Sequence, residues 1–250
     1  MRYAGKKAVV TGGTHGIGMA VVRSLLDGGA EVLLTGRDEA NVESARTDLA
    51  GRAAHVVRSD AASMADIGAL GDVVAETLGT VDLVFVNVGY ATFGPIEDVT
   101  EEVYDRVFDI KAKGAFFTTQ RLLPLVNEGG SFVFTTAVLD GLGFPQSSVA
   151  TGSVTAVRGF AKSFAAEFLA RGIRVNVVSP GFTQTPTMGI AGLTAEERAA
   201  NQKAGEEATP MSRHGDPAEI AAAVLYLAFD ATFTTGTVLE VDGGLGHIAA

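Results

Sequence analysis

Two patterns of apolar residues alternate along almost the whole of this chain. Short apolar runs are typical of strands buried on both faces, whereas apolar residues spaced three and four apart indicate amphipathic helices. The predicted strands, each centred on apolar residues, occupy residues 8–11, 31–35, 55–58, 82–86, 131–135, 174–178 and 237–241. Helical patterns occupy residues 16–27, 38–49, 63–78, 100–125, 148–171 and 216–229.

This alternation predicts an α/β protein with a single-domain Rossmann fold over residues 1–250. We expect a doubly wound, seven-stranded parallel sheet with helices on both faces. A polar segment at about 182–211 interrupts the alternation of strands and helices, and it contains a short helix capped by Thr194. Such a segment would cover a substrate. Its apolar residues predict a partly apolar small molecule: Phe182, Met188, Ile190 and Leu193.

Composition and charge exclude several classes of function. The chain of 250 residues has no cysteine and four scattered histidines, which argues against a disulfide framework or a metal site. A net charge of -10 disfavours nucleic acid as the main partner. No apolar run approaches the length of a membrane span, and the N-terminus lacks the apolar region of a signal peptide. We therefore expect a cytoplasmic protein that binds neither nucleic acid nor membrane.

The first strand and the first helix are joined by a glycine-rich loop. Gly12, Gly16 and Gly18 have the spacing G-x-x-x-G-x-G. Glycines allow the backbone to approach a phosphate closely, and the free N–H groups of the following helix attract an anion. At a strand-to-helix junction this pattern predicts a dinucleotide site.

The end of the second strand bears on which dinucleotide is bound. A carboxylate there would bind the 2′-hydroxyl of NAD, but the chain has Gly36 followed by Arg37. An arginine fork pairs with a 2′-phosphate, and His15 adds a second positive contact. NADP(H) is therefore favoured over NAD(H). Asp38 is a carboxylate that would mildly favour NAD(H), but a role as a helix cap explains it.

Further motifs lie in order along essentially the whole chain. After the loop Thr11–Gly18, they comprise Asp60, Asn87-Val88-Gly89, the segment 174–181 and Val241-Asp-Gly-Gly244. With these motifs the chain resembles the short-chain dehydrogenase/reductase family, although Val86 stands where the family usually has a first Asn. The resemblance implies an oxidoreductase in which Asp60 and Ala61 hold the adenine. The complete set of expected cofactor contacts is Gly12, Thr14, His15, Gly16, Ile17, Gly18, Arg37, Asp60, Ala61, Asn87, Gly89, Pro180, Gly181 and Thr185.

The same resemblance predicts an unusual catalytic half. The family uses Asn, Ser, Tyr and Lys, and alignment from flanking residues places Lys111, Ala137, Ala150 and Val154 at those positions. Neither Ala150 nor Val154 can donate the proton that carbonyl reduction needs. Lys111 is the one tentative catalytic residue. Burial would lower its pKa and make it an acid/base, or its charge would bind an anion or the ribose. Alternatively, it reaches solvent or pairs with Asp109 or Asp140.

Three functions follow from these predictions. The first is an NADP(H)-dependent oxidoreductase with a rearranged site, in which Lys111, Tyr90 or a substrate group replaces the tyrosine. The second is a catalytically silent nucleotide sensor, or an inactive subunit beside an active homologue. The third is non-redox chemistry in the same pocket, such as dehydration, cyclisation or isomerisation. By family resemblance we also expect a homotetramer or dimer that assembles through the two long helices flanking the site, the second at residues 157–168.

Overall fold

The computed structural model describes residues 1–186 and 194–248, apart from the side chain of Asp140. Three residues used above to predict an apolar substrate, Met188, Ile190 and Leu193, lie outside this range. The strands and main helices are β1 (Lys7–Thr11), α1 (Gly16–Asp27), β2 (Glu31–Gly36), α2 (Glu39–Asp48), β3 (Ala54–Arg58), α3 (Met64–Thr77), β4 (Val81–Val86), α4 (Glu101–Phe108), α5 (Gly114–Leu122), β5 (Val126–Thr135), α6 (Ser148–Glu167), β6 (Arg174–Pro180), α7 (Ala195–Ala208), α8 (Pro217–Leu225) and β7 (Val238–Val241).

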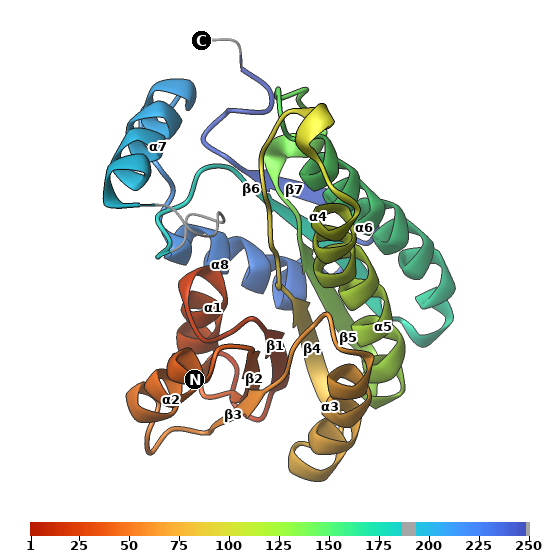
Figure 1. Cartoon of the computed structure of the whole chain (residues 1–250). Coiled ribbons are helices and arrows are strands. Elements are labelled where there is room, and N and C mark those ends of the chain that lie inside the picture. Colours follow the sequence, from red (N-terminus) through yellow and green to blue (C-terminus); the bar gives the residue numbers. More distant parts are fainter. Residues whose placement is uncertain (187–193, 249–250) are drawn as a thin grey trace.

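The strands form one parallel sheet in the order β3-β2-β1-β4-β5-β6-β7. Helices α1, α2 and α8 cover one face, and α3, α5 and α6 cover the other (Figure 1). Each face has its own apolar core, centred on Leu25 and Val224 on the first and on Phe132 and Phe164 on the second. The predicted doubly wound, seven-stranded sheet is therefore confirmed. Its strand order reverses between β1 and β4, which is where such folds bind ligands.

The predicted helix caps account for where several helices begin. The side chains of Asp38, Ser63 and Thr100 each accept a hydrogen bond from the third residue of the helix that follows. Asp216 and Glu219 form a reciprocal capping box at the start of α8. These short polar side chains satisfy backbone N–H groups that have no partner inside the helix.

The predicted single helix over 100–125 is wrong. It is divided into α4, a π-helical turn η2 (Asp109–Lys113), α5 and a 3₁₀ turn (Leu123–Leu125). The wider π-helical turn η2 separates α4 from α5, and Ile110, Lys111 and Ala112 within it are buried. The π-helical turn ends just before Gly114, where α5 begins.

Four other boundaries also differ from the expectation. Strand β5 begins at Val126, not Ser131, and α7 has 14 residues where a short helix was expected. Helix α6 ends at Glu167, and a 3₁₀ turn follows it. Helix α8 ends at Leu225 and continues as the π-helix η6 (Tyr226–Asp230). Among the described helices, none is long and apolar enough to cross a membrane.

Candidate functional site

The glycine loop passes over the carboxyl ends of β1 and β2 without room for side chains. A Cβ on Gly18 would lie 2.1 Å from the carbonyl oxygen of Gly12, and one on Gly36 would lie 2.5 Å from Thr14 Cγ2. Gly12 and Gly16 have φ values of +64° and +55°, which favour glycine. His15 precedes α1 as an extended N-cap without a capping side-chain hydrogen bond. The loop therefore has the shape and the open helix terminus that a pyrophosphate needs.

The loop is held in place by Asn87, the residue after β4. The Asn87 side-chain nitrogen donates to the carbonyl oxygen of Gly12 at 3.1 Å, and its backbone nitrogen donates to Thr11 Oγ1 at 3.0 Å. Thr135 Oγ1, at the end of β5, donates to the Asn87 side-chain oxygen at 3.1 Å. One side chain thus ties together the ends of β1, β4 and β5, where the strand order reverses.

Asp60 and Ala61 lie after β3, at the expected adenine end. The Asp60 carboxylate accepts a hydrogen bond from the Ala62 backbone at 3.0 Å, and the Asp60 backbone donates to Asp66 at 2.8 Å. This backbone bond, followed by one from the Ser63 side chain, lowers the pKa of Asp66. Ala61 packs on the start of α5, because a Cβ on Gly114 would lie 2.4 Å from the carbonyl oxygen of Ala61. Both residues are fixed by backbone contacts.

The opposite end of the predicted cofactor site lies after β6. Gly181 packs against Asp242, the residue after β7. The backbone N–H of Gly181 donates to the Val241 carbonyl oxygen at 3.1 Å. Thr185 reaches the glycine loop, where a Cβ on Gly16 would lie 3.2 Å from its Cγ2 atom. The structure therefore brings this C-terminal segment onto the N-terminal loop, as one continuous ligand site requires.

Lys111 is buried at the same edge of the sheet, with 5% of its surface exposed. Its ammonium nitrogen donates to the carbonyl oxygens of Thr135 at 2.5 Å and Val88 at 3.2 Å. It also lies 3.7 Å from the position of a Cβ on Gly89. Burial lowers the pKa of Lys111 from 10.5 to about 8. The alternative in which it pairs with Asp109 is wrong, because that partner belongs to Lys113 at 3.0 Å.

The other three positions aligned with the family's catalytic residues carry small or apolar side chains. Ala150 and Val154 are buried in the first half of α6, and Ala137 follows β5 in extended conformation. The neighbouring hydroxyls are engaged elsewhere: Ser153 donates to the Ala150 carbonyl oxygen, and Thr136 to that of Val178. Tyr90, the other proton donor considered, lies beneath the Arg106 guanidinium at 4.7 Å.

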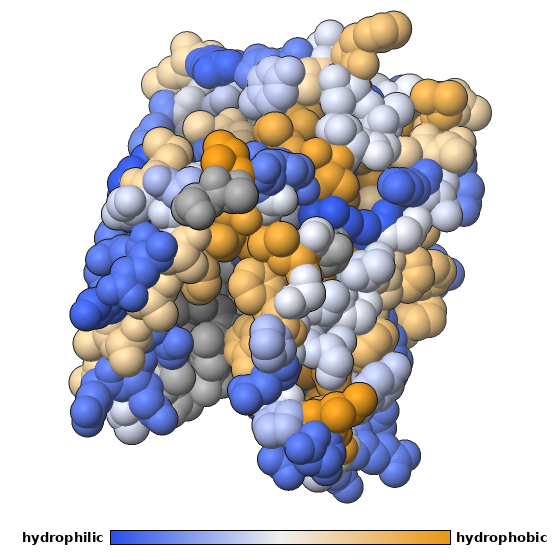
Figure 2. Space-filling model, turned by 90° about the horizontal axis from the view of Figure 1, so that it is seen from above, coloured by the Kyte–Doolittle hydropathy of each residue, from blue (hydrophilic) through white to orange (hydrophobic). Residues whose placement is uncertain are grey.

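Two cavities open near this edge of the sheet. One of about 310 Å³ has a largely apolar lining that includes Phe93, Val99 and Val149. The second, of about 390 Å³, lies between the loop after β6 and α7, and it is lined by Gln184, Thr185, Arg198, Gln202 and His214. Figure 2 views the face from above and shows apolar residues towards its middle and hydrophilic residues around its rim.

Comparisons with known proteins agree with this geometry. The model of the enoyl-(acyl carrier protein) reductase family matches residues 12–246. Oxidoreductase asL5 of Sarocladium schorii is 35% identical over 99% of this chain and 98% of its own. The chain belongs to the short-chain dehydrogenase/reductase family of oxidoreductases.

Other members of the family are similar over nearly the whole chain. L-fucose dehydrogenase of Mus musculus is 33% identical over 97% of this chain and 89% of its own. The crystal structure of a blue fluorescent protein from a metagenomic library, in complex with NADPH, is 29% identical, with a TM-score of 0.86. It covers 98% of this chain and 99% of that one. The family uses NAD(P), and the glycine cradle described above fits such a group.

Sequence reasoning missed three residues near the site. Arg58 ends β3 beside Gly36, a relation that depends on the register of the two strands and has no sequence signal of its own. Arg158, from α6, donates to Ser179 Oγ at 3.1 Å and lies 3.7 Å from Glu240. His214 is buried against Phe182, with ring centroids 5.5 Å apart. No sequence pattern distinguishes His214 from an ordinary loop residue.

Proposed function

We propose that this chain binds NADP(H) across the carboxyl edge of its sheet. The adenosine end would lie over β1, β2 and β3, and the nicotinamide end between Asn87 and Thr185. The absence of Cβ atoms at Gly12, Gly16 and Gly18 supports this placement. Arg37, directly after β2, supports the preference for a 2′-phosphate. A relative solved with NADPH makes the same preference reasonable.

We also propose that the chain is an oxidoreductase in which Lys111 replaces the usual proton donor. When bound, a nicotinamide dinucleotide supplies or accepts the hydride. The carbonyl oxygen then needs a proton, and Lys111 Nζ would donate it and return to its charged form from solvent. The observation that carries this proposal is the burial of Lys111, whose pKa of about 8 lies near working pH. Below that pKa the ammonium is an acid for reduction, and above it the amine is a base for oxidation.

The substrate that we propose is a small, partly apolar carbonyl compound or alcohol. The cavity containing Phe93, Pro95 and Val103 supports the apolar part, since few polar groups face it. The second cavity, lined by Arg198 and Gln202, offers hydrogen-bond donors to a polar part.

A silent nucleotide-binding protein is the second candidate, and one observation favours it. The linings of the two cavities include none of Lys111, Ala137, Ala150 and Val154. Lys111 already donates two of its three N–H groups to backbone carbonyls. In this case the scaffold would bind the dinucleotide and act as a sensor, or as a partner of an active homologue. Association through α5 and α6, as a homo-oligomer or with that homologue, is also a proposal.

A titration of NADPH fluorescence tests the first step, with NADH as the matched ligand. We expect NADPH to bind more tightly than NADH, and absence of binding to both would refute the cofactor assignment. A carbonyl and alcohol panel then separates the two candidates. Turnover that is lost in Lys111→Met and kept in Lys113→Met supports the enzyme. Binding without turnover across the panel supports the silent protein.

A further inference from the structure

Two arginines begin at the corner of the sheet where the adenosine ribose would lie. Arg37 directly follows β2, and Arg58 is the last residue of β3. The two strands are hydrogen-bonded neighbours, with Gly36 paired to Arg58 in register. Adjacent parallel strands lie about 4.8 Å apart, so both side chains start from the same small area. Gly36 has no side chain to separate them, and Thr14 of the glycine loop packs on it.

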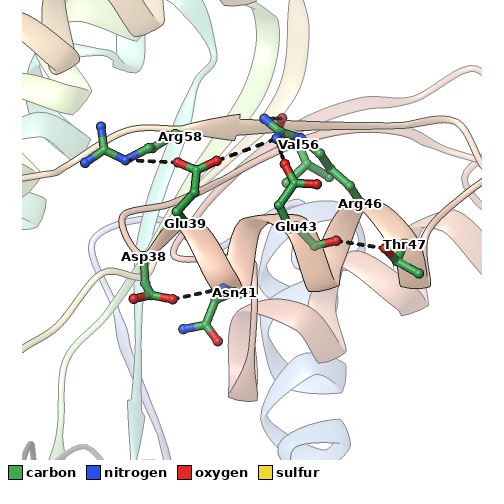
Figure 3. Close-up of polar contacts among 8 residues, drawn as sticks. All are labelled: Asp38, Glu39, Asn41, Glu43, Arg46, Thr47, Val56 and Arg58. Carbon is green, nitrogen blue, oxygen red and sulfur yellow. Dashed lines mark hydrogen bonds and ion pairs between the residues drawn. The ribbon is translucent and has the colours of Figure 1, made fainter.

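The Glu39 carboxylate holds one side of the Arg58 guanidinium. Arg58 Nε lies 3.4 Å from a Glu39 oxygen, in the first turn of α2. Figure 3 shows the Glu39 carboxylate between the side chains of Arg58 and Arg46. Within residues 1–186 and 194–248, the two Nη nitrogens of Arg58 form no hydrogen bond or ion pair, and neither does the Arg37 guanidinium. Both arginines thus present unused donors at one corner.

The nearby carboxylates already have partners, and these include Asp66, which accepts hydrogen bonds from the Asp60 backbone and Ser63 and whose pKa the Arg58 charge helps to lower. Asp38 accepts a hydrogen bond from the Asn41 backbone at 2.9 Å as the cap of α2. Glu39 is shared between Arg58 and Arg46, which lies 3.8 Å away. Arg46 is itself held by Glu43 and by the Val56 carbonyl oxygen. The corner therefore combines two open guanidinium groups with carboxylates that already have partners, which suits a dianion.

We propose that Arg58 is a second ligand of the 2′-phosphate, beside Arg37. A phosphate has three acceptor oxygens, and one planar guanidinium satisfies at most two of them. A second guanidinium from the adjacent strand supplies the remaining contact. The pair with Glu39 engages Arg58 through Nε and leaves both Nη groups available. This inference rests on the proposed binding of NADP(H), and it identifies Arg58 as a residue that determines the choice between phosphorylated and unphosphorylated cofactor.

Isothermal titration with cofactor fragments tests the proposal without any need for turnover. The probes are adenosine 2′,5′-bisphosphate and 5′-AMP, which differ only in the 2′-phosphate. We expect Arg58→Gln to weaken binding of the bisphosphate about tenfold, the usual effect of losing one charge-assisted contact, and to leave 5′-AMP unchanged. Arg58→Lys should recover part of the loss. Arg52→Gln, which removes an arginine at the opposite end of β3 from Arg58, is the control matched in charge and should change neither affinity.

The outcomes separate this inference from the proposed function. Suppose that the wild type prefers the bisphosphate, that Arg37→Gln removes this preference and that Arg58→Gln leaves it unchanged. This result overturns the role of Arg58 and leaves the NADP(H) assignment standing. Equal weakening of both probes by Arg58→Gln also overturns it, because the loss would then be structural. Wild-type protein that binds neither fragment, or binds both equally, overturns the 2′-phosphate assignment and this inference together. Arg58 is 57% exposed, so its variants should fold, and thermal melting checks this.

Discussion

The ammonium nitrogen of Lys111 lies 2.5 Å from the carbonyl oxygen of Thr135, at the end of β5. Burial lowers the pKa of Lys111 from 10.5 to about 8 in the folded protein. Between these two values the unfolded chain binds more protons than the folded one, so stability rises with pH. The cost of burying the charge is fully present below about pH 8 and is relieved by about pH 10.5.

We therefore predict a pH-dependent stability difference between the wild type and Lys111→Met. The wild-type free energy of unfolding should rise relative to the variant by about 3 kcal/mol from pH 8 to pH 10.5. Urea denaturation at intervals across this range measures it. Lys113→Met is the control. Lys113 is exposed, so the difference in unfolding free energy between the wild type and this variant should not change with pH. A flat difference for Lys111→Met would mean that Lys111 is hydrated in solution.

The same group predicts the pH dependence of turnover. If Lys111 donates the proton, the rate of carbonyl reduction should be maximal below about pH 8 and fall above it, while alcohol oxidation should rise across the same range. Initial rates in both directions between pH 6 and pH 10 measure this. Removing the acid in Lys111→Met should lower the rate by a factor on the order of 10²–10⁴. Reduction that is independent of Lys111 at every pH would assign the proton to another donor.

The glycine loop gives a matched pair of substitutions. A Cβ on Gly18 would lie 2.1 Å from the Gly12 carbonyl oxygen and 2.9 Å from the Asn87 side-chain nitrogen. We expect Gly18→Ala to destabilise the protein by about 1–3 kcal/mol through overpacking, and to weaken NADPH binding by displacing the loop. Chemical denaturation and NADPH fluorescence titration measure the two effects.

Gly68 provides the control for that substitution. It lies inside α3, where a Cβ would meet no atom within 4 Å. Gly68→Ala should therefore stabilise the helix by about 0.5–1 kcal/mol and leave NADPH binding unchanged. If both glycines tolerate alanine equally, the close approach of Gly18 to Gly12 does not constrain the loop.

The sequence was sufficient to predict the fold and the edge at which the site lies. Residues 83–86 are apolar throughout because both faces of a parallel sheet are covered. Asp38, Ser63 and Asp216 mark helix starts because their side chains cap the first turn. Local signals of this kind survive in a single sequence. The parallel pairing then brings Asn87 and Thr135 together without any further information.

Contacts between residues far apart in the sequence were not predictable. Lys111 lies four residues after the buried Val107, so helical spacing places it on the inward face, but the carbonyl partners of its ammonium come from the ends of β4 and β5. Arg58 was overlooked for a related reason. Its relation to Arg37 exists only through the register of β2 and β3, which lie 21 residues apart in sequence at these positions. Long-range geometry of this kind leaves no periodic signal.

Restoring the family's usual residues tests how much of the catalytic scaffold is intact. The combined variant Lys111→Asn, Ala137→Ser, Ala150→Tyr and Val154→Lys would return a proton donor to α6. Ala150 and Val154 are buried, so the larger side chains should cost about 1–3 kcal/mol of stability through overpacking. If the helix presents them correctly, reduction of a carbonyl panel should increase on the order of 10²-fold or more, the usual contribution of general acid catalysis. Initial rates of NADPH oxidation measure the gain.

The control for this variant carries Ala150→Phe in place of Ala150→Tyr, with the other three substitutions kept. The phenyl ring has nearly the same volume and the same packing cost but lacks the hydroxyl proton. A gain seen with Tyr and absent with Phe would show that proton donation was the missing function. Equal activity of the two variants would instead attribute any gain to packing. If both are folded and bind NADPH but are inactive, α6 does not direct position 150 toward the bound substrate, and the alignment of Ala150 with the family's tyrosine is then wrong.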